Sequence, residues 1–201
     1  MNNSRTTLLI LIVNLLFFGC NSRNTTQKGI FSTLDQMRHI CSEAETNQDV
    51  FYDDAFDLIP NIVSHRESAI PVMRDYISLN RHAFTTHSDH IFLSIVGETG
   101  IRIGGVSVIP LFGDILGIGS YDGGLTALEG LEKIFDGPST TRNEQEQIRG
   151  ILTETINSQH NKHIHNVAVP ILRYINKELA KSEEGDSPQE LRLEPDDERS
   201  D

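Results

Sequence analysis

The segment Ala69-Ile-Pro-Val-Met-Arg74 decides the fold prediction, because the chain repeats its pattern 99 residues later as Ala168-Val-Pro-Ile-Leu-Arg173. Both copies continue to a tyrosine and an isoleucine, and partial copies occur at Val108-Ile-Pro-Leu-Phe112 and Leu58-Ile-Pro60. Proline is favoured in the first turn of a helix, where its missing N–H leaves no hydrogen bond unmade. Each copy therefore predicts the beginning of a helix with an apolar face behind it.

Apolar residues recur at helical spacing along most of the chain, which predicts a series of amphipathic helices. The expected helices cover residues 30–44, 51–59 (ended by Pro60), 70–77, 122–135 and 167–179, with another after the capping-box pattern Thr141-Arg-Asn-Glu144. Residues 80–90 predict a polar loop, with Asp89 as a candidate cap of a short apolar segment from Ile91 to Val96. No convincing alternation predicts strands, so the expected fold class is all-α.

The central segment from Gly97 to Gly130 contains ten of the fifteen glycines of the chain. Charged residues interrupt its apolar runs, which are too short to cross a bilayer. It also lacks lysine and any Gly-Lys-Ser/Thr element, so a phosphate-binding loop is not indicated. Turns and close backbone packing around a short buried helix from Pro110 explain the glycines better.

The helices that open with proline resemble those of HEAT-type helical repeats. Pro71 and Pro110 are 39 residues apart, close to the HEAT period of about 40 to 47 residues, whereas Pro110 and Pro170 are 60 apart and do not fit it. The resemblance implies a helical-repeat fold, or α-solenoid. An irregular helical bundle with a glycine-rich central segment is the alternative.

The first twenty residues carry a targeting pattern. Arg5 precedes an apolar run from Leu8 to Phe18, which is too short to span a bilayer, and Gly19 and Cys20 follow. This pattern resembles the signal peptides of bacterial prolipoproteins, although that family usually has leucine and a small residue where Phe17 and Phe18 stand. The resemblance implies cleavage after residue 19, acylation of Cys20 as the lipidation site, and a weak preference for the outer membrane from Asn21. An ordinary secreted protein and an uncleaved anchor are the alternatives.

Four parts of the chain are expected: a signal peptide (1–19), a flexible tether (20–29), a single α-helical domain (30–181) and an acidic disordered tail (182–201). The net charge is −12, of which the tail carries −7 and residues 20–181 carry −6, with Arg5 adding +1. Without a basic stripe, nucleic-acid binding is excluded. Acylation of Cys20 would leave Cys41 alone, so we expect no intrachain disulfide and a buried, inert thiol.

Two groups of histidines in the sequence are potential metal ligands. A metal site needs convergent ligands, and no cysteine or His-Glu motif completes either group. We therefore predict no metal site and interpret both groups as polar connectors. The metal-ligand candidates would be His160, His163 and His165, and the second group is His82, His87 and His90.

No catalytic residue and no cofactor are predicted. Asp53 and Asp54 are adjacent and so point to different helix faces, and Glu129 and Glu132 lie on the outer face of their expected helix. Solvation explains such carboxylates better than general acid–base catalysis. A hydrolase whose residues are scattered in the sequence is the least favoured reading, and a deep polar pocket around Asp114, Tyr121 and Asp122 would favour it.

Together these features predict a lipid-anchored protein of the bacterial envelope that binds another protein without catalysing a reaction. Helical repeats commonly serve in this way, as a fold-level analogy. An assembly adaptor and an immunity-type inhibitor of a toxin both suit a small acidic domain, whose field would attract a basic partner. The alternatives are an envelope protein that binds a small ligand or a metal and, less favoured, a hydrolase.

Overall fold

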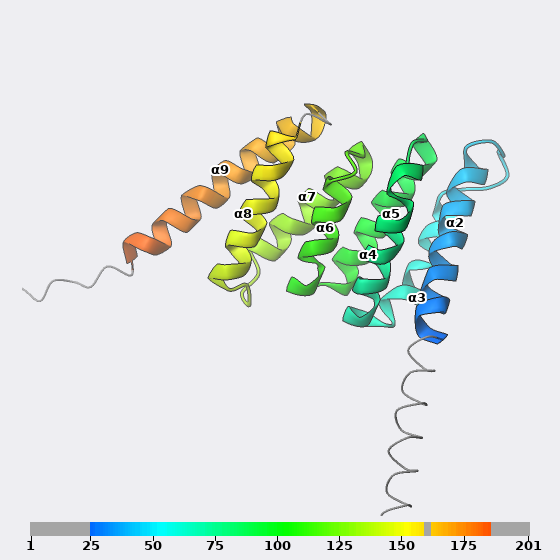
Figure 1. Cartoon of the computed structure of the whole chain (residues 1–201), viewed down its shortest axis with the longest axis horizontal. Helices are drawn as coiled ribbons and strands as arrows, with labels where there is room; N and C mark the ends of the chain where they lie inside the picture. The colour runs from blue at the N-terminus through cyan, green and yellow to red at the C-terminus, as the bar shows by residue number, and fades with distance from the viewer. Residues whose placement is uncertain (1–24, 159–161, 186–201) are drawn as a thin grey trace, which may run out of the picture.

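The computed structural model describes residues 25–158 and 162–185, and all regular elements in these ranges are helical (Figure 1). The all-α prediction is confirmed. A helix over residues 25–44 comes first. It is followed by α2 (Asp53–Phe56), α3 (Ile59–Val63), η1 (Arg66–Ser68), α4 (Ala69–Asn80), η2 (Arg81–Ala83), α5 (His87–Ile103), η3 (Val106–Val108), α6 (Ile109–Leu116), α7 (Tyr121–Phe135), α8 (Arg142–Asn157) and α9 (Lys162–Gly185).

The helices stack in two layers. In the first layer, the 25–44 helix contacts α4 through the rings of Phe31 and Tyr76, α4 contacts α6, and α6 contacts α8. In the second layer, α3, α5, α7 and α9 contact one another in that order. Figure 1 shows the chain advancing across the view, from the 25–44 helix on the right to α9 on the left. This stacking of neighbours is that of an α-solenoid, the first of the two all-α alternatives.

Helices of the first layer run parallel to one another. The Tyr76 hydroxyl of α4 donates to Asp35, 41 residues earlier, and Arg74 of α4 pairs with Asp114 of α6, 40 residues later. Further along, Arg38 reaches Asn80, and Arg81 reaches Gly117. In each pair of helices, a residue later in one helix contacts a residue later in the other, so the two helices are parallel. The 25–44 helix, α4 and α6 therefore begin at the same end of the molecule. The offsets agree with the period of about 40 residues that the sequence predicted.

Three of the four proline segments lie at the beginning of a helix, as predicted. Pro60 and Pro110 lie at the second position of α3 and α6, and Pro71 is the third residue of α4. The prediction for Pro170 was wrong, because α9 begins at Lys162 and continues through it. Burial of Ala168 and Ile175 holds α9 against the core despite the hydrogen bond that proline removes. Since α9 belongs to the second layer, Pro170 does not continue the period set by Pro71 and Pro110.

The glycine-rich segment is more helical than predicted. Instead of a loop over 80–90 and a short segment to Val96, α5 begins at His87 and runs to Ile103, through two glycines. A Cβ atom on Gly97 would lie 2.9 Å from Thr126 Cγ2, and one on Gly123 would lie 2.7 Å from Leu93 Cβ. These glycines let α5 and α7 approach closely, so the interpretation as close backbone packing is confirmed.

Several predicted boundaries change. Pro60 does not end a helix over 51–59, because that segment contains the short α2 (Asp53–Phe56) and the first residue of α3, the helix in which Pro60 lies. Residues 25–29, expected in the tether, and 182–185, expected in the tail, are helical. The Thr141–Glu144 capping box is confirmed at the beginning of α8.

Cys20, the predicted signal peptide and the remaining tail lie outside the described residues. None of the described helices combines the length and apolar character needed to cross a membrane.

Candidate functional site

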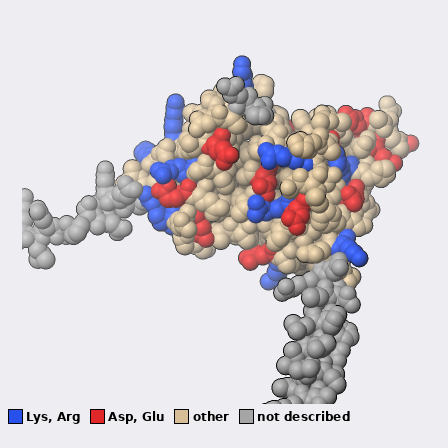
Figure 2. Space-filling view, viewed as in Figure 1, with Lys and Arg blue, Asp and Glu red and all other residues tan. Residues whose placement is uncertain are grey.

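A hollow of about 470 Å³ lies between α4, α6 and α8 on the first-layer face. We call it the first-layer groove. Figure 2, in the same view as Figure 1, shows acidic and basic side chains interspersed over the face of the module. The walls of the groove come from three consecutive helices of the first layer, together with η2. The polar side chains that line the groove are Arg74, Arg81, Asp114, Glu154, Thr155 and Ser158.

The floor of the groove is made by two glycines of α6. Gly113 and Gly117 are four residues apart and so lie on the same side of the helix. A Cβ atom on Gly113 would lie 3.3 Å from Ile151 Cδ1, and one on Gly117 would lie 3.3 Å from Arg81 Nη2. The absence of side chains at these positions lets α8 and the guanidinium of Arg81 come close to α6.

Arg74 and Asp114 form an ion pair across the groove. Arg74 Nε donates to Asp114 Oδ2 at 2.5 Å, and a second, longer bond joins Nη2 to Oδ1 at 3.4 Å. The hydrogen bond to Asp114 raises the pKa of Arg74 above its ordinary value, against the opposing effect of burial. Because the side chains are 43% and 35% exposed, the pair contributes little to stability.

Arg81 closes the end of α6. Its Nη2 donates to the carbonyl of Gly117 at 2.7 Å, where the C-terminal end of a helix favours a positive charge. On the opposite wall, the hydroxyls of Thr155 and Ser158 donate to carbonyls of their own helix, which leaves their oxygens able to accept from a partner. Glu154 adds an exposed carboxylate on this wall. The groove therefore offers guanidinium, carboxylate and hydroxyl groups on a rigid frame.

Two buried groups, the Cys41 thiol and the Tyr76 hydroxyl, have pKa values raised further above neutral pH. Burial, followed by the charge of Asp89, raises the pKa of Cys41 to about 12. Burial and the hydrogen bond to Asp35 raise the pKa of Tyr76. General acid–base catalysis works best with a pKa near the operating pH, so these shifts hold their groups in one protonation state.

The residues proposed for a hydrolase pocket are not assembled into one site. Asp114 lines the first-layer groove, but neither Tyr121 nor Asp122 does. Tyr121 begins α7 in the second layer, where its ring meets that of His163 edge to face at 5.8 Å. Asp122 contributes its main-chain carbonyl to the hydroxyl of Thr126. The arrangement that would have favoured a hydrolase, a polar pocket shared by these three residues, is therefore not found among these contacts.

The histidine groups are partly described. His163 and His165 lie in the first turns of α9, and His160 lies outside the described residues. Within the described ranges, no group of three or more histidine, cysteine or acidic residues could hold a metal ion. The second group is spread over η2, which contains His82, and the first turn of α5, which contains His87 and His90.

Other singled-out side chains have structural roles. Glu129 pairs with Lys133 one turn along α7 at 2.7 Å, and Asp54 accepts a bond from the backbone N–H of Phe51. Cys41 is fully buried, as the helical spacing of its apolar neighbours predicted. These placements provide no convergence of catalytic groups.

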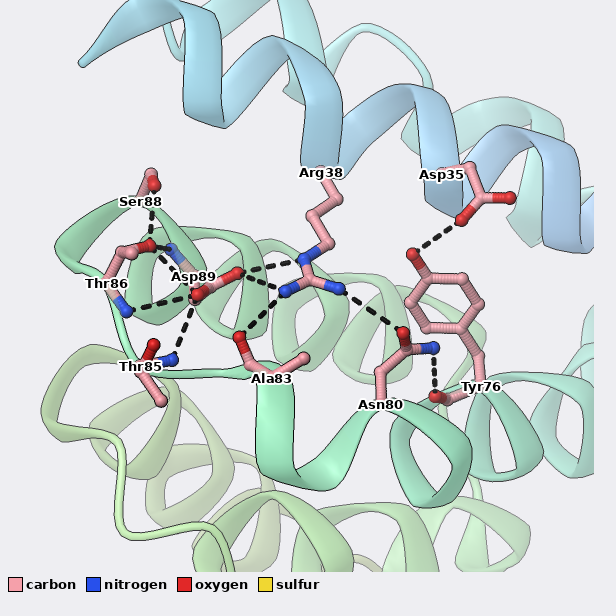
Figure 3. Close-up of polar contacts among 9 residues, drawn as sticks. All are labelled: Asp35, Arg38, Tyr76, Asn80, Ala83, Thr85, Thr86, Ser88 and Asp89. Atoms are coloured by element: carbon pink, nitrogen blue, oxygen red, sulfur yellow. Dashed lines mark hydrogen bonds and ion pairs between the residues drawn. The ribbon is translucent and has the colours of Figure 1, made fainter.

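A second polar cluster joins the 25–44 helix to α4 and α5 (Figure 3). Arg38 Nε donates to Asp89 Oδ1 at 2.8 Å, while its other nitrogens reach the Asn80 side chain and the carbonyl of Ala83. The guanidinium carbon also lies 4.8 Å from the ring centroid of Phe84. With its polar groups paired inside the protein, the cluster fixes the first helix in place.

Asp89, which is only 5% exposed, is the centre of this cluster. Burial raises its pKa, but hydrogen bonds from the backbones of Thr86 and Thr85, the Thr86 hydroxyl and Arg38 outweigh burial and lower the pKa below its ordinary value. Asp89 and Thr86 also form the capping box that begins α5. Asp89 is therefore a structural carboxylate held in its charged form.

Sequence reasoning missed most of the groove. Of its polar residues, only Asp114 was singled out for a site, and its partner Arg74 appeared only as the end of the repeated segment. A usable signal was present, because Arg74 and Asp114 are separated by one 40-residue repeat and so occupy equivalent positions on neighbouring helices.

Comparison of the chain with protein-family models, with curated proteins and with solved structures gives no match. The groove is therefore interpreted from its own geometry and chemistry.

Proposed function

We propose that the mature protein is a lipid-anchored lipoprotein of the bacterial envelope and a non-catalytic module that binds another protein. The anchor is the acylated Cys20, with the outer membrane favoured by Asn21. The observation that carries the binding role is the first-layer groove, where consecutive helices present charged groups on a rigid scaffold. An adaptor in an assembly and an immunity-type inhibitor of a toxin both fit this role.

The chemistry of the groove supports a protein partner. Arginine pairs with carboxylates through a planar fork and is enriched at protein interfaces, and Arg81 lies exposed along one wall. Glu154 on the facing wall would pair with a basic side chain of the partner. The ion pair of Arg74 and Asp114 lies between them and is exposed enough to exchange partners. A surface of mixed charge would satisfy all these groups.

The negative charge of the module supports a partner that is basic overall. Residues 20–181 carry a net charge of −6, and the tail adds −7. Such a field attracts a basic protein and raises the rate of association, in a way that weakens as salt is added.

The test is affinity capture of the tagged, acylated protein after crosslinking in cells. We expect one stoichiometric protein partner. The double variant Arg81→Ala, Glu154→Ala should reduce its capture about tenfold, since a loss of about 1.4 kcal/mol of binding energy has that effect. The matched control is Arg102→Ala, Glu129→Ala, which removes one basic and one acidic exposed side chain from the second layer. Equal effects of both double variants, or no partner with intact acylated protein, would refute the proposed role of the groove.

A further inference from the structure

One end of the module contains the starts of the first-layer helices, and we call it the proximal end. The parallel contacts of the 25–44 helix with α4, and of α4 with α6, place residue 25, η1 and η3 at this end. Helix α5 ends there at Ile103, immediately before η3. In Figure 1 this is the lower edge, where the blue helix begins.

The length of chain between Cys20 and the first helix limits how far this end can be from the membrane. This step rests on the proposed acylation of Cys20. The helix includes residue 25, so four residues separate it from Cys20, and the five Cα–Cα steps between them reach about 17 Å when fully extended. Residues 25–44 form a helix of about 30 Å, which is longer than that reach. The start of this helix therefore lies within about 17 Å of the acylated residue, whereas its other end, which we call the distal end, can lie much farther from the membrane.

The proximal end also carries a hollow whose lining is more apolar than that of the first-layer groove. It has a volume of about 410 Å³, and its walls include Ile101, Val106, Phe112 and Ile134. Val106 in η3 is 36% exposed at this end. The chain turns back into η3 at Gly104 and Gly105, whose φ angles of 72° and 74° favour glycine. A partly apolar hollow with the exposed side chain of Val106 beside it thus lies at the end that the connection holds closest to lipid.

Two basic side chains flank this surface. Arg66 is exposed in η1, beside Glu67, which lines the hollow. Lys133 also lines the hollow and pairs with Glu129 of its own helix at 2.7 Å. Basic side chains beside an apolar surface are typical of protein surfaces that rest at the interface of a bilayer.

We propose that the proximal end lies against the bilayer, with η3 and the apolar hollow facing lipid. The acylated Cys20 brings this end to the membrane, and the hollow with Val106 sets the orientation of the module. The first-layer helices then stand away from the bilayer, and the first-layer groove faces sideways, where a second envelope protein can reach it.

The experiment measures the depth of labelled positions in the acylated, full-length mature protein. Single cysteines are introduced as Val106→Cys and, as a second proximal position, Ser139→Cys, and each is labelled with a fluorescent maleimide. The matched control is Leu79→Cys, because Leu79 is 77% exposed near the end of α4, at the distal end. Cys20 is acylated and Cys41 is fully buried, so the label goes to the introduced cysteine. Circular dichroism verifies that each variant is folded.

The labelled proteins are bound to vesicles of phosphatidylethanolamine and phosphatidylglycerol that contain a lipid with a nitroxide quencher on its headgroup. We expect quenching at the two proximal positions to be several-fold stronger than at Leu79→Cys. Equal quenching at all three positions, stronger quenching at the distal position, or no quenching of vesicle-bound protein would overturn the proposed orientation. Flotation of the vesicles is scored separately. Protein that does not float with them would show that the anchor itself has failed, and the orientation would fall with it.

Discussion

Arg74 and Asp114, 40 residues apart in the sequence, form an ion pair between α4 and α6, with 2.5 Å between Nε and Oδ2. The pair lies at equivalent positions of neighbouring helices in the first layer. In a solenoid, residues one repeat apart in the sequence lie at equivalent positions of neighbouring helices and can come into contact. The 40-residue repeat therefore explains why Arg74 and Asp114 meet in the first-layer groove.

Breaking this pair should affect binding more than folding. We expect Asp114→Asn to change the free energy of unfolding by at most about 1 kcal/mol, since both side chains are partly exposed and exposed pairs contribute little. The same substitution should weaken capture of the partner. Chemical denaturation and affinity capture of one protein preparation check both effects. A loss of several kcal/mol would show that the pair holds the fold.

The Arg38–Asp89 pair should behave in the opposite way. Arg38→Ala leaves the carboxylate of Asp89, whose side chain is 7% exposed, without its charged partner, so we expect a loss of about 3 kcal/mol in the free energy of unfolding. Arg102→Ala is the matched control, because it removes an arginine from a more exposed pair with Glu98. That variant should lose less than about 1 kcal/mol. Similar losses in the two variants would contradict the anchoring role of the Arg38 cluster.

Asp89 should make stability depend on acid pH. Its pKa is lower in the folded protein than the ordinary value of 3.8, so its contribution is fully present above that value and is lost as pH falls through the lower folded pKa. We expect the melting temperature of the native protein to fall below about pH 4 more steeply than that of Asp89→Asn. The check is thermal unfolding across this pH range. Parallel curves would show that Asp89 is not stabilised in its charged form.

The glycines of α7 and α8 should respond differently to alanine. In Gly123→Ala the new Cβ would lie 2.7 Å from Leu93 Cβ, and we expect a loss of about 1–3 kcal/mol from overpacking. Gly150, in the middle of α8, has nothing within 4 Å of such an atom. Gly150→Ala should therefore stabilise the protein by about 0.5–1 kcal/mol through helix propensity. Urea denaturation compares the two, and a stable Gly123→Ala would argue against close packing of α5 and α7.

Acylation is tested by Cys20→Ala. This substitution removes the thiol that would carry the lipid, so incorporation of labelled fatty acid should disappear and the protein should leave the membrane fraction or accumulate as its precursor. Fractionation and acyl labelling of cells that express either form provide the comparison. Unchanged labelling in the variant would exclude Cys20 as the site of attachment.

The sequence predicted the elements whose signals are local. The Thr141–Glu144 capping box, the helix that begins at Tyr121 and the burial of Cys41 all follow from side chains within one or two turns. By contrast, Pro170 was misread, because the tertiary burial that lets α9 continue through it involves distant helices. For the glycines of α5 the sequence indicated turns or close packing without separating them, because the packing depends on the approach of α7, which is distant in the sequence. The groove could not be predicted because its residues come from three helices that are separated in the sequence and meet only in the folded chain.

The central claim is that the first-layer groove binds a protein partner in the envelope. Its most direct test places a photoreactive amino acid at Thr155 inside the groove and, in a separate strain, at Glu132 on the second layer, and irradiates intact cells. The account predicts a single strong crosslinked partner from position 155 and little or none from position 132. Crosslinking of one partner from position 132 but not from position 155 would place the binding surface on the second layer and contradict the claim.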